Sequence, residues 1–249
     1  MNASWSRPAL IAVNLPTKIL LVATLIFTLL PMGAHGMESA EARKLKTEKY
    51  LKTKKVPFNK DLPLIEDAKS VKIRSAQDVA RRAIVLYNIT ALGFGIEKQK
   101  VVETLKKSGV WDSMAPSEKE FVEAAKPTKQ QTINATWRVE ALWTLLWALG
   151  KVESLDFPIA PCDPQRIHGL MPNPEEAKGF IASAKLRNIE AILDETDKIY
   201  RIHWAVRDAQ LNKKTVPAKL DSGVVVERHY ALNWLIWYAD EWDEITTDT

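Results

Sequence analysis

Ions set among tryptophan and aliphatic residues constrain the fold of this 249-residue chain more than any other feature. Segment 224–243 contains Glu227 and Arg228 in a stretch that is otherwise rich in valine, leucine and tryptophan. An unpaired charge buried in such surroundings costs several kcal/mol, which is comparable with the whole stability of a domain. Other parts of the chain must therefore bring partners to these two side chains.

Two more segments carry ions on surfaces that are otherwise apolar when residues are placed at about 100° per position around a helix. In residues 136–149, Arg138 falls among leucines and Glu140 falls beside tryptophans. Because this segment is apolar on all sides, we expect it to form a central helix. A later helical segment places His203 and Arg207 on its apolar face. The predicted buried polar network consists of Arg138, Glu140, His203, Arg207, Glu227 and Arg228.

This network has two interpretations, and the sequence leaves both open. In the first, arginine and glutamate side chains from neighbouring helices pair and fix the packing of those helices. Such pairs add little net stability, but removing one partner costs about 3–5 kcal/mol. In the second interpretation, the ions line a polar pocket in which pKa values are shifted, as they are in catalytic sites.

A narrow acidic stripe along residues 185–211 forms a second candidate site, because side chains three, four and seven residues apart share one face of a helix. Three carboxylates with a histidine nearby could bind a divalent ion. The alternative is a solvated face on which Asp197 and Arg201 pair at i, i+4. The sequence itself assigns no metal and no cofactor. The residues of this candidate set are Glu190, Asp194, Asp197, Arg201 and, from the last helix, His229.

Several common functional classes lack support in this sequence. It contains no His-Glu-x-x-His segment, no glycine-rich phosphate loop, no Gly-x-Ser-x-Gly turn and no Cys-x-x-Cys pair, which argues against the usual hydrolase, nucleotide-binding and zinc classes. The formal charge of +4 is too small to indicate nucleic acid as a partner. The single cysteine, Cys162, excludes an intrachain disulfide, and its position in a proline-rich loop gives no sign of a nucleophile.

The N-terminus has the three-part layout of a secretory signal peptide, which we expect to span residues 1–36. Arg7 and Lys18 precede an apolar run at residues 19–30, and the small residues Ala34 and Gly36 follow, with His35 between them. Such a run is short for a membrane-spanning helix, which needs about 20 residues. Cleavage predicts a secreted or periplasmic protein. The alternative is a membrane anchor formed by residues 9–30, and the membrane is a partner only in that case.

Helical periodicity predicts an all-α protein, with about seven or eight helices in a single domain at residues 68–249. Ahead of it, residues 37–67 are expected to form a charged amphipathic arm and an extended connector. Residues 151–172 are rich in proline and are expected to form a loop. The longer helices are expected at residues 75–92, 97–107, 136–149, 185–211 and 221–239, with shorter ones starting at Ser117 and after Asn173.

Several of these segments together resemble the bacterial family known as domain of unknown function 4272. The resemblance covers roughly residues 45–249, nearly the whole chain after the leader. It implies a helical domain without an established activity, so it transfers no catalytic residue. It rests on Trp-Arg-Val-Glu-Ala-Leu-Trp at 137–143, Glu-Arg-His-Tyr-Ala-Leu-Asn-Trp at 227–234, and the stretches at 62–63, 74–83, 147–150, 192–197, 200–205, 242–243 and 247–249.

The function that these features favour is binding without catalysis. We expect an exported helical domain that holds a protein or a small ligand near its last two helices. The alternative is a metal-assisted enzyme that uses the acidic stripe together with His203 or His229.

Overall fold

Helices account for all the regular secondary structure of residues 38–249, the part of the chain that the computed structural model describes. The prediction of an all-α domain is confirmed: of the nine α-helices in the described residues, eight lie within residues 68–249, where about seven or eight were expected, and the first lies in the predicted arm. Two of them, in and after the proline-rich loop, are only 5 and 6 residues long. The helices are α1 (Ala40–Thr53), α2 (Ala76–Gly93), α3 (Lys98–Lys107), α4 (Pro116–Glu123), α5 (Lys129–Ala148), α6 (Pro164–His168), α7 (Ala177–Ala182), α8 (Ile189–Leu211) and α9 (Ser222–Leu235).

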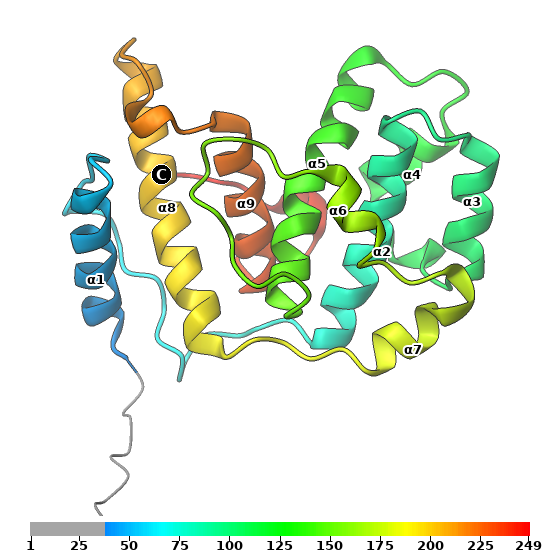
Figure 1. The fold of residues 1–249 in the computed structure, drawn as a ribbon, viewed down its shortest axis with the longest axis horizontal. Coiled ribbons are helices and arrows are strands. Elements are labelled where there is room, and N and C mark those ends of the chain that lie inside the picture. Colours follow the sequence, from blue (N-terminus) through cyan, green and yellow to red (C-terminus); the bar gives the residue numbers. More distant parts are fainter. Residues whose placement is uncertain (1–37) are drawn as a thin grey trace, which may run out of the picture. The chain divides into compact units, whose positions relative to one another are not determined.

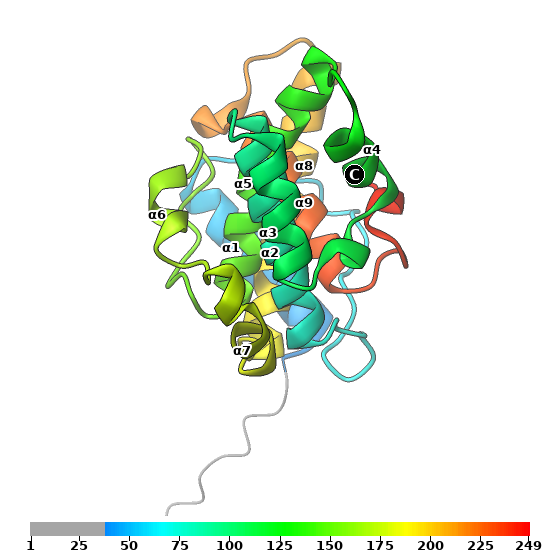
Figure 2. The ribbon, with the colours of Figure 1, turned by 90° about the vertical axis from the view of Figure 1, so that its right-hand side faces the viewer.

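Six of these helices pack side by side in the order α1, α8, α9, α5, α2, α3 (Figure 1). Figure 2 looks along this row from the α3 end. The order in space differs from the order along the chain, so α8 and α9 lie between α1 and the helices that follow α1 in sequence. The segment that links α1 to α2 must therefore cross the row past α8 and α9.

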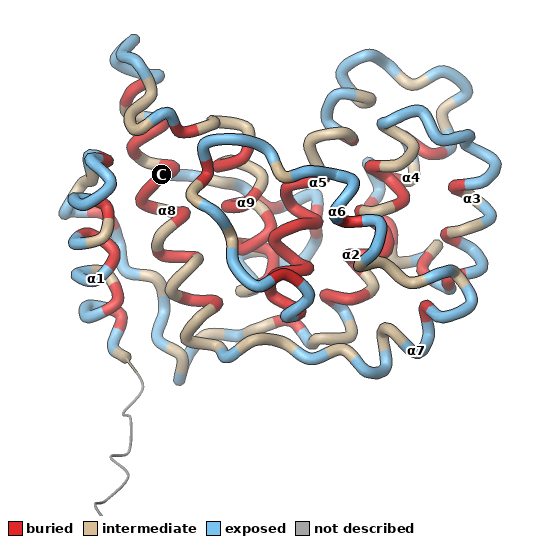
Figure 3. The backbone as a smooth tube through the Cα atoms, viewed as in Figure 1, coloured by how far each residue is buried: buried red, intermediate tan, exposed pale blue. Residues whose placement is uncertain are grey.

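Helix α5 is the centre of the core, as its apolar sequence predicted. Residues 139–149 are buried without interruption, and the helix packs against α2 on one side and α9 on the other (Figure 3). Helix α2 is buried on two sides as well. Its Ala83 and Leu86 join the main core with α5, α8 and α9, whereas its Val85 and Ile89 join a second cluster with α3 and α4.

Local signals set the ends of the helices, and several predicted boundaries were wrong. Helix α5 begins at Lys129, seven residues before the predicted start, because Thr128 and Gln131 form a reciprocal capping box there. Helix α4 begins at Pro116 with Ala115 in the cap position, so Ser117 is not the cap. Ser117 donates a hydrogen bond to Asp243 instead.

Helix α9 ends at Leu235, four residues before its predicted end, in a Schellman motif. The backbone N–H of Tyr238 donates to the carbonyl of Asn233, and Trp237 adopts a left-handed conformation with φ of 58°. A bulky residue in this conformation costs roughly 1–2 kcal/mol. The guanidinium of Arg74 lies 3.9 Å from the Trp237 ring and donates to the carbonyl of Asp240, and both contacts hold the turn in place.

The expected signal peptide at residues 1–36 and the alternative anchor at residues 9–30 lie outside the described residues. Within residues 38–249, no helix is both long enough and apolar enough to cross a membrane. Residues 37–249 form one compact unit, so the predicted charged arm is packed onto the helical body rather than separate from it. Its helix, α1, lies against α8.

Candidate functional site

Within the predicted network, the more deeply buried ion pair joins Glu140 of α5 to Arg228 of α9. Their side chains are 0% and 3% exposed, and Arg228 Nε lies 3.4 Å from Glu140 Oε2. Arg228 also donates to the backbone carbonyl of Asp156 at 2.6 Å, and Glu140 accepts from the backbone N–H of Cys162. The pair thus ties two central helices to the proline-rich loop. Neither side chain lines the cavity described below.

The second pair that the structure forms within this network, Arg138 and Glu227, lies nearer the surface between the same two helices. Arg138 Nη1 is 3.1 Å from Glu227 Oε2, with the two side chains 23% and 12% exposed. The Arg138 guanidinium also lies 4.4 Å from the centre of the Tyr230 ring. Burial raises the pKa of the Glu227 carboxyl, and the nearby Arg138 offsets part of that rise.

The prediction that Arg207 belongs to the buried network was wrong. Arg207 is exposed and donates to the side chain of Gln210, so it contacts none of the buried ions. It lies at the edge of the apolar face of α8, where a long side chain reaches water although its Cα packs against the protein. The network is therefore two separate pairs, Glu140–Arg228 and Arg138–Glu227, together with the histidine His203.

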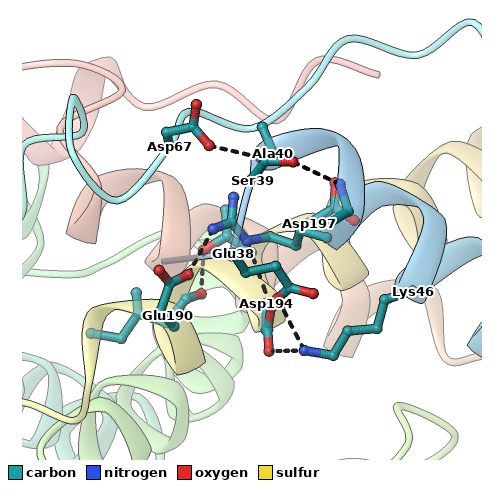
Figure 4. A network of polar contacts seen from close by, with 12 residues as sticks. Glu38, Ser39, Ala40, Lys46, Asp67, Glu190, Asp194 and Asp197 are labelled. Carbon is teal, nitrogen blue, oxygen red and sulfur yellow. Dashed lines mark hydrogen bonds and ion pairs between the residues drawn. The ribbon is translucent and has the colours of Figure 1, made fainter. Parts of the chain in front are cut away.

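The acidic stripe of α8 faces helix α1, so its interpretation as a solvated face was wrong (Figure 4). Arg43 of α1 is 1% exposed and lies 2.9 Å from Glu190 and 3.6 Å from Asp194. Lys46 of α1 adds another ion pair to this contact, with its Nζ 2.6 Å from Oδ2 of Asp194. In addition, the carboxylate of Asp67, from the connector, accepts from the first backbone N–H of α1, that of Ala40, at 2.7 Å.

Arg201 and Asp197 pair within α8 at i, i+4, and this pair is buried rather than solvated. Arg201 Nη2 lies 2.7 Å from Asp197 Oδ1, with the side chains 0% and 1% exposed. Arg201 also donates to the backbone carbonyl of Pro63 at 3.2 Å, while Arg43 donates to that of Glu66 at 3.1 Å. Two buried guanidinium groups therefore hold the connector in its path beside α8.

This stretch of connector forms one wall of a cavity of about 490 Å³. Helices α8 and α9 supply the opposite wall through Tyr200, His229 and Asn233. Most of the lining is apolar or aromatic, with a few polar groups, which is the composition typical of small-molecule sites. The complete lining is Pro63, Leu64, Ile65, Glu66, Tyr200, His229, Asn233, Ile236, Tyr238, Asp248 and Thr249.

His229 connects this cavity to a second histidine in the interior. Its Nδ1 lies 2.8 Å from Nδ1 of His203, and the two side chains are almost fully buried. Burial lowers the pKa of His203 to about 4, with a further contribution from Arg207, and lowers that of His229 to about 3. Both rings are therefore neutral at pH 7. One Nδ1 must donate and the other accept, so the tautomers of the two rings are linked.

The carboxylates of the stripe are arranged for ion pairs rather than for a metal. Glu190, Asp194 and Asp197 each contact an arginine or a lysine, and His229 bonds to another histidine. Among residues 38–249, no three or more side chains of the metal-binding types converge on one point. The residues predicted as one set are therefore divided between the α1–α8 contact and the cavity.

Of the predicted site residues, only His229 lines the cavity, with His203 directly behind it. Tyr200, Asn233 and Tyr238 also line the cavity and were not predicted as site residues. Helical periodicity places Asn233 on a polar stripe of the last helix with His229, which was the one signal in the sequence that could have pointed to it. Cys162 is half-buried, and burial together with the adjacent Glu140 raises the pKa of its thiol, the opposite of what a nucleophile needs.

The chain belongs to the family described as Domain of unknown function (DUF4272), whose model matches residues 43–245. The match begins within α1 and includes both histidines, both central ion pairs and nearly the whole cavity lining. The resemblance seen in the sequence is thereby confirmed. No curated protein and no solved structure gives a significant match to this chain.

We predict that Arg228→Ala destabilises the protein by about 3–5 kcal/mol, because it leaves Glu140 charged and buried without a partner. Denaturant unfolding monitored by tryptophan fluorescence measures the change. Arg207→Ala is the matched control, since it removes an exposed arginine from the neighbouring helix and should change stability by less than about 0.5 kcal/mol. Equal losses of stability in the two variants would contradict the conclusion that Arg228 is buried and paired.

We also predict that stability falls as the pH drops below about 6.5, the usual pKa of histidine. Both buried histidines have lower pKa values in the folded protein, so the unfolded chain takes up protons first. Each histidine should lower the free energy of unfolding by about 1–2 kcal/mol as the pH falls from 6.5 to 5. His203→Asn should remove about half of this dependence. A free energy of unfolding that stays constant over this range would refute the prediction.

Proposed function

We propose that this domain binds a small organic molecule in the cavity between the connector and the last two long helices, without catalysing a reaction. The observation that carries the proposal is the way the cavity is built. Its walls come from four separate segments of the chain, and buried arginines hold one of those walls through backbone carbonyls. A binding site needs such rigid support for its lining residues.

The lining supports recognition of a ligand of modest size. Tyr200, Tyr238 and Ile236 provide apolar and aromatic contact area, while His229 and Asn233 provide polar groups. The side chain of Asn233 donates to the backbone carbonyl of Thr246 at 2.9 Å, which fixes the orientation of its amide. Preorganised polar groups of this kind lower the entropic cost of binding.

The alternative function, a metal-assisted enzyme, has less support from the geometry. It relied on the acidic stripe of α8 together with a histidine. Arginine and lysine side chains already neutralise those carboxylates, and His203 and His229 bond to each other. A divalent ion would have to displace Arg43 or Arg201 from a buried pair, which costs several kcal/mol. We therefore favour binding over this enzymatic mechanism.

The cavity proposal predicts that a larger side chain at its mouth blocks binding. Leu64 is 42% exposed and lines the cavity, so Leu64→Trp should weaken binding of single-ring aromatic fragments about tenfold or more while the protein stays folded. Leu211→Trp, at a 73% exposed position that does not line the cavity, is the matched control. Chemical shifts of Tyr200, His229 and Asn233 report the binding by NMR. A fragment that binds the wild type and Leu64→Trp equally well would place its site elsewhere.

We propose further that the protein is exported and that residues 1–36 are removed. The support is the order of basic residues, apolar run and small residues in the sequence. Expression of the full chain in a bacterial host with an export pathway, followed by cell fractionation and N-terminal sequencing, tests this. We expect protein outside the cytoplasm that starts near Met37. Protein that retains residues 9–30 and sediments with membranes would support the anchor instead.

A further inference from the structure

We propose that the cavity selects an organic cation, a small ammonium ion with an aromatic or alkyl body, over neutral and anionic molecules of the same shape. This inference rests on the proposed function, since it names the class of ligand for the same site. It follows from the charges, rings and hydrogen-bonding groups of the lining.

The charge of the lining is negative. Glu66 and Asp248 contribute carboxylates to it, and no lysine or arginine belongs to it. Within the described part of the chain, neither carboxylate forms an ion pair, although Asp248 accepts from the hydroxyl of Thr246 at 2.7 Å. The carboxylates of the α8 stripe, in contrast, are all paired. The cavity is therefore a place where an added positive charge gains attraction and an added negative charge meets repulsion.

The nearest basic side chains do not reverse this balance. Arg201, whose backbone contact holds Pro63, is neutralised by Asp197 at 2.7 Å. Arg43, whose backbone contact holds Glu66, faces Glu190 and Asp194. Each guanidinium shares its charge with at least one carboxylate outside the lining, so the negative charge of the cavity is not cancelled.

Aromatic rings in the lining favour a cation as well. Tyr200 and Tyr238 both line the cavity, and the faces of aromatic rings attract ammonium groups, more strongly where water is excluded. Tyr200 already lies 5.9 Å from the guanidinium carbon of Arg201. Tyr238 is 54% exposed, and no cation is in contact with its ring among the described residues.

The polar groups of the lining can accept hydrogen bonds from an ammonium group. Asn233 uses its N–H to bind the carbonyl of Thr246, which leaves its amide oxygen as an acceptor. His229 is neutral, because burial lowers its pKa to about 3, and it adds no positive charge to the cavity. When its Nδ1 donates to His203, its Nε2 is an acceptor too. In this tautomer, His229 can therefore accept a hydrogen bond from an N–H group of the ligand.

Three probes that share one aromatic ring test the inference: tyramine, 4-ethylphenol and 4-hydroxyphenylacetate, which are cationic, neutral and anionic at pH 7. We expect tyramine to bind about tenfold more tightly than 4-ethylphenol, and 4-hydroxyphenylacetate to bind most weakly. The advantage of tyramine should shrink as sodium chloride is raised, because the attraction is electrostatic. Titration of the purified protein by NMR or calorimetry measures the three affinities.

A double variant, Glu66→Gln with Asp248→Asn, should bring the affinities of tyramine and 4-ethylphenol close together. The matched control, Glu41→Gln with Asp61→Asn, removes two exposed acids outside the lining and should keep the full difference. Binding of 4-ethylphenol as tight as that of tyramine would overturn the preference for cations and leave the cavity proposal intact. Binding of none of the three probes at millimolar concentration would overturn both.

Discussion

The rest of this structure depends on the need to neutralise arginine side chains that have been taken out of water. Arg43, Arg201 and Arg228 are each at most 3% exposed, and each meets a carboxylate and a backbone carbonyl. The carboxylate supplies the opposite charge, and the carbonyl satisfies a further N–H group. Because the carbonyls belong to loops, these pairs fix loops that have little apolar surface of their own.

The consequence for function lies in the connector between α1 and α2. This segment crosses the row of helices, and its sequence contains two prolines but no helical pattern that would shape it. Arg43 and Arg201 bind its backbone from α1 and α8, so its path is set by charge pairs made elsewhere. That path encloses the cavity. Ion pairs that contribute little net stability thus determine the geometry of the one place where we expect a ligand.

Polar side chains on different faces of α9 therefore serve different purposes. Glu140 and Arg228 are sealed in the core, where they join helices to the proline-rich loop. His229, one residue further along, lines the cavity and bonds to His203. A step of one residue turns a side chain by about 100° around the helix, which is enough to move it from the core to a site. Arg207, four residues after His203, is offset by only about 40° around α8, and it reaches water at the edge of the apolar face.

The sequence by itself determined the fold class, the central position of α5 and the positions of most helices, because helical periodicity and capping act over a few neighbouring residues. It also identified Arg138, Glu140, Glu227 and Arg228 as ions to be buried and paired, although it wrongly included Arg207 and did not single out Arg43. Only the tertiary structure decided which partners they met: Arg43 for the α8 stripe, and the carbonyls of a loop for Arg201. The tertiary structure also decided the cavity, because its walls come from segments around residues 64, 200, 230 and 248. Contacts between segments so far apart depend on how the helices pack, and no local pattern in the chain encodes that.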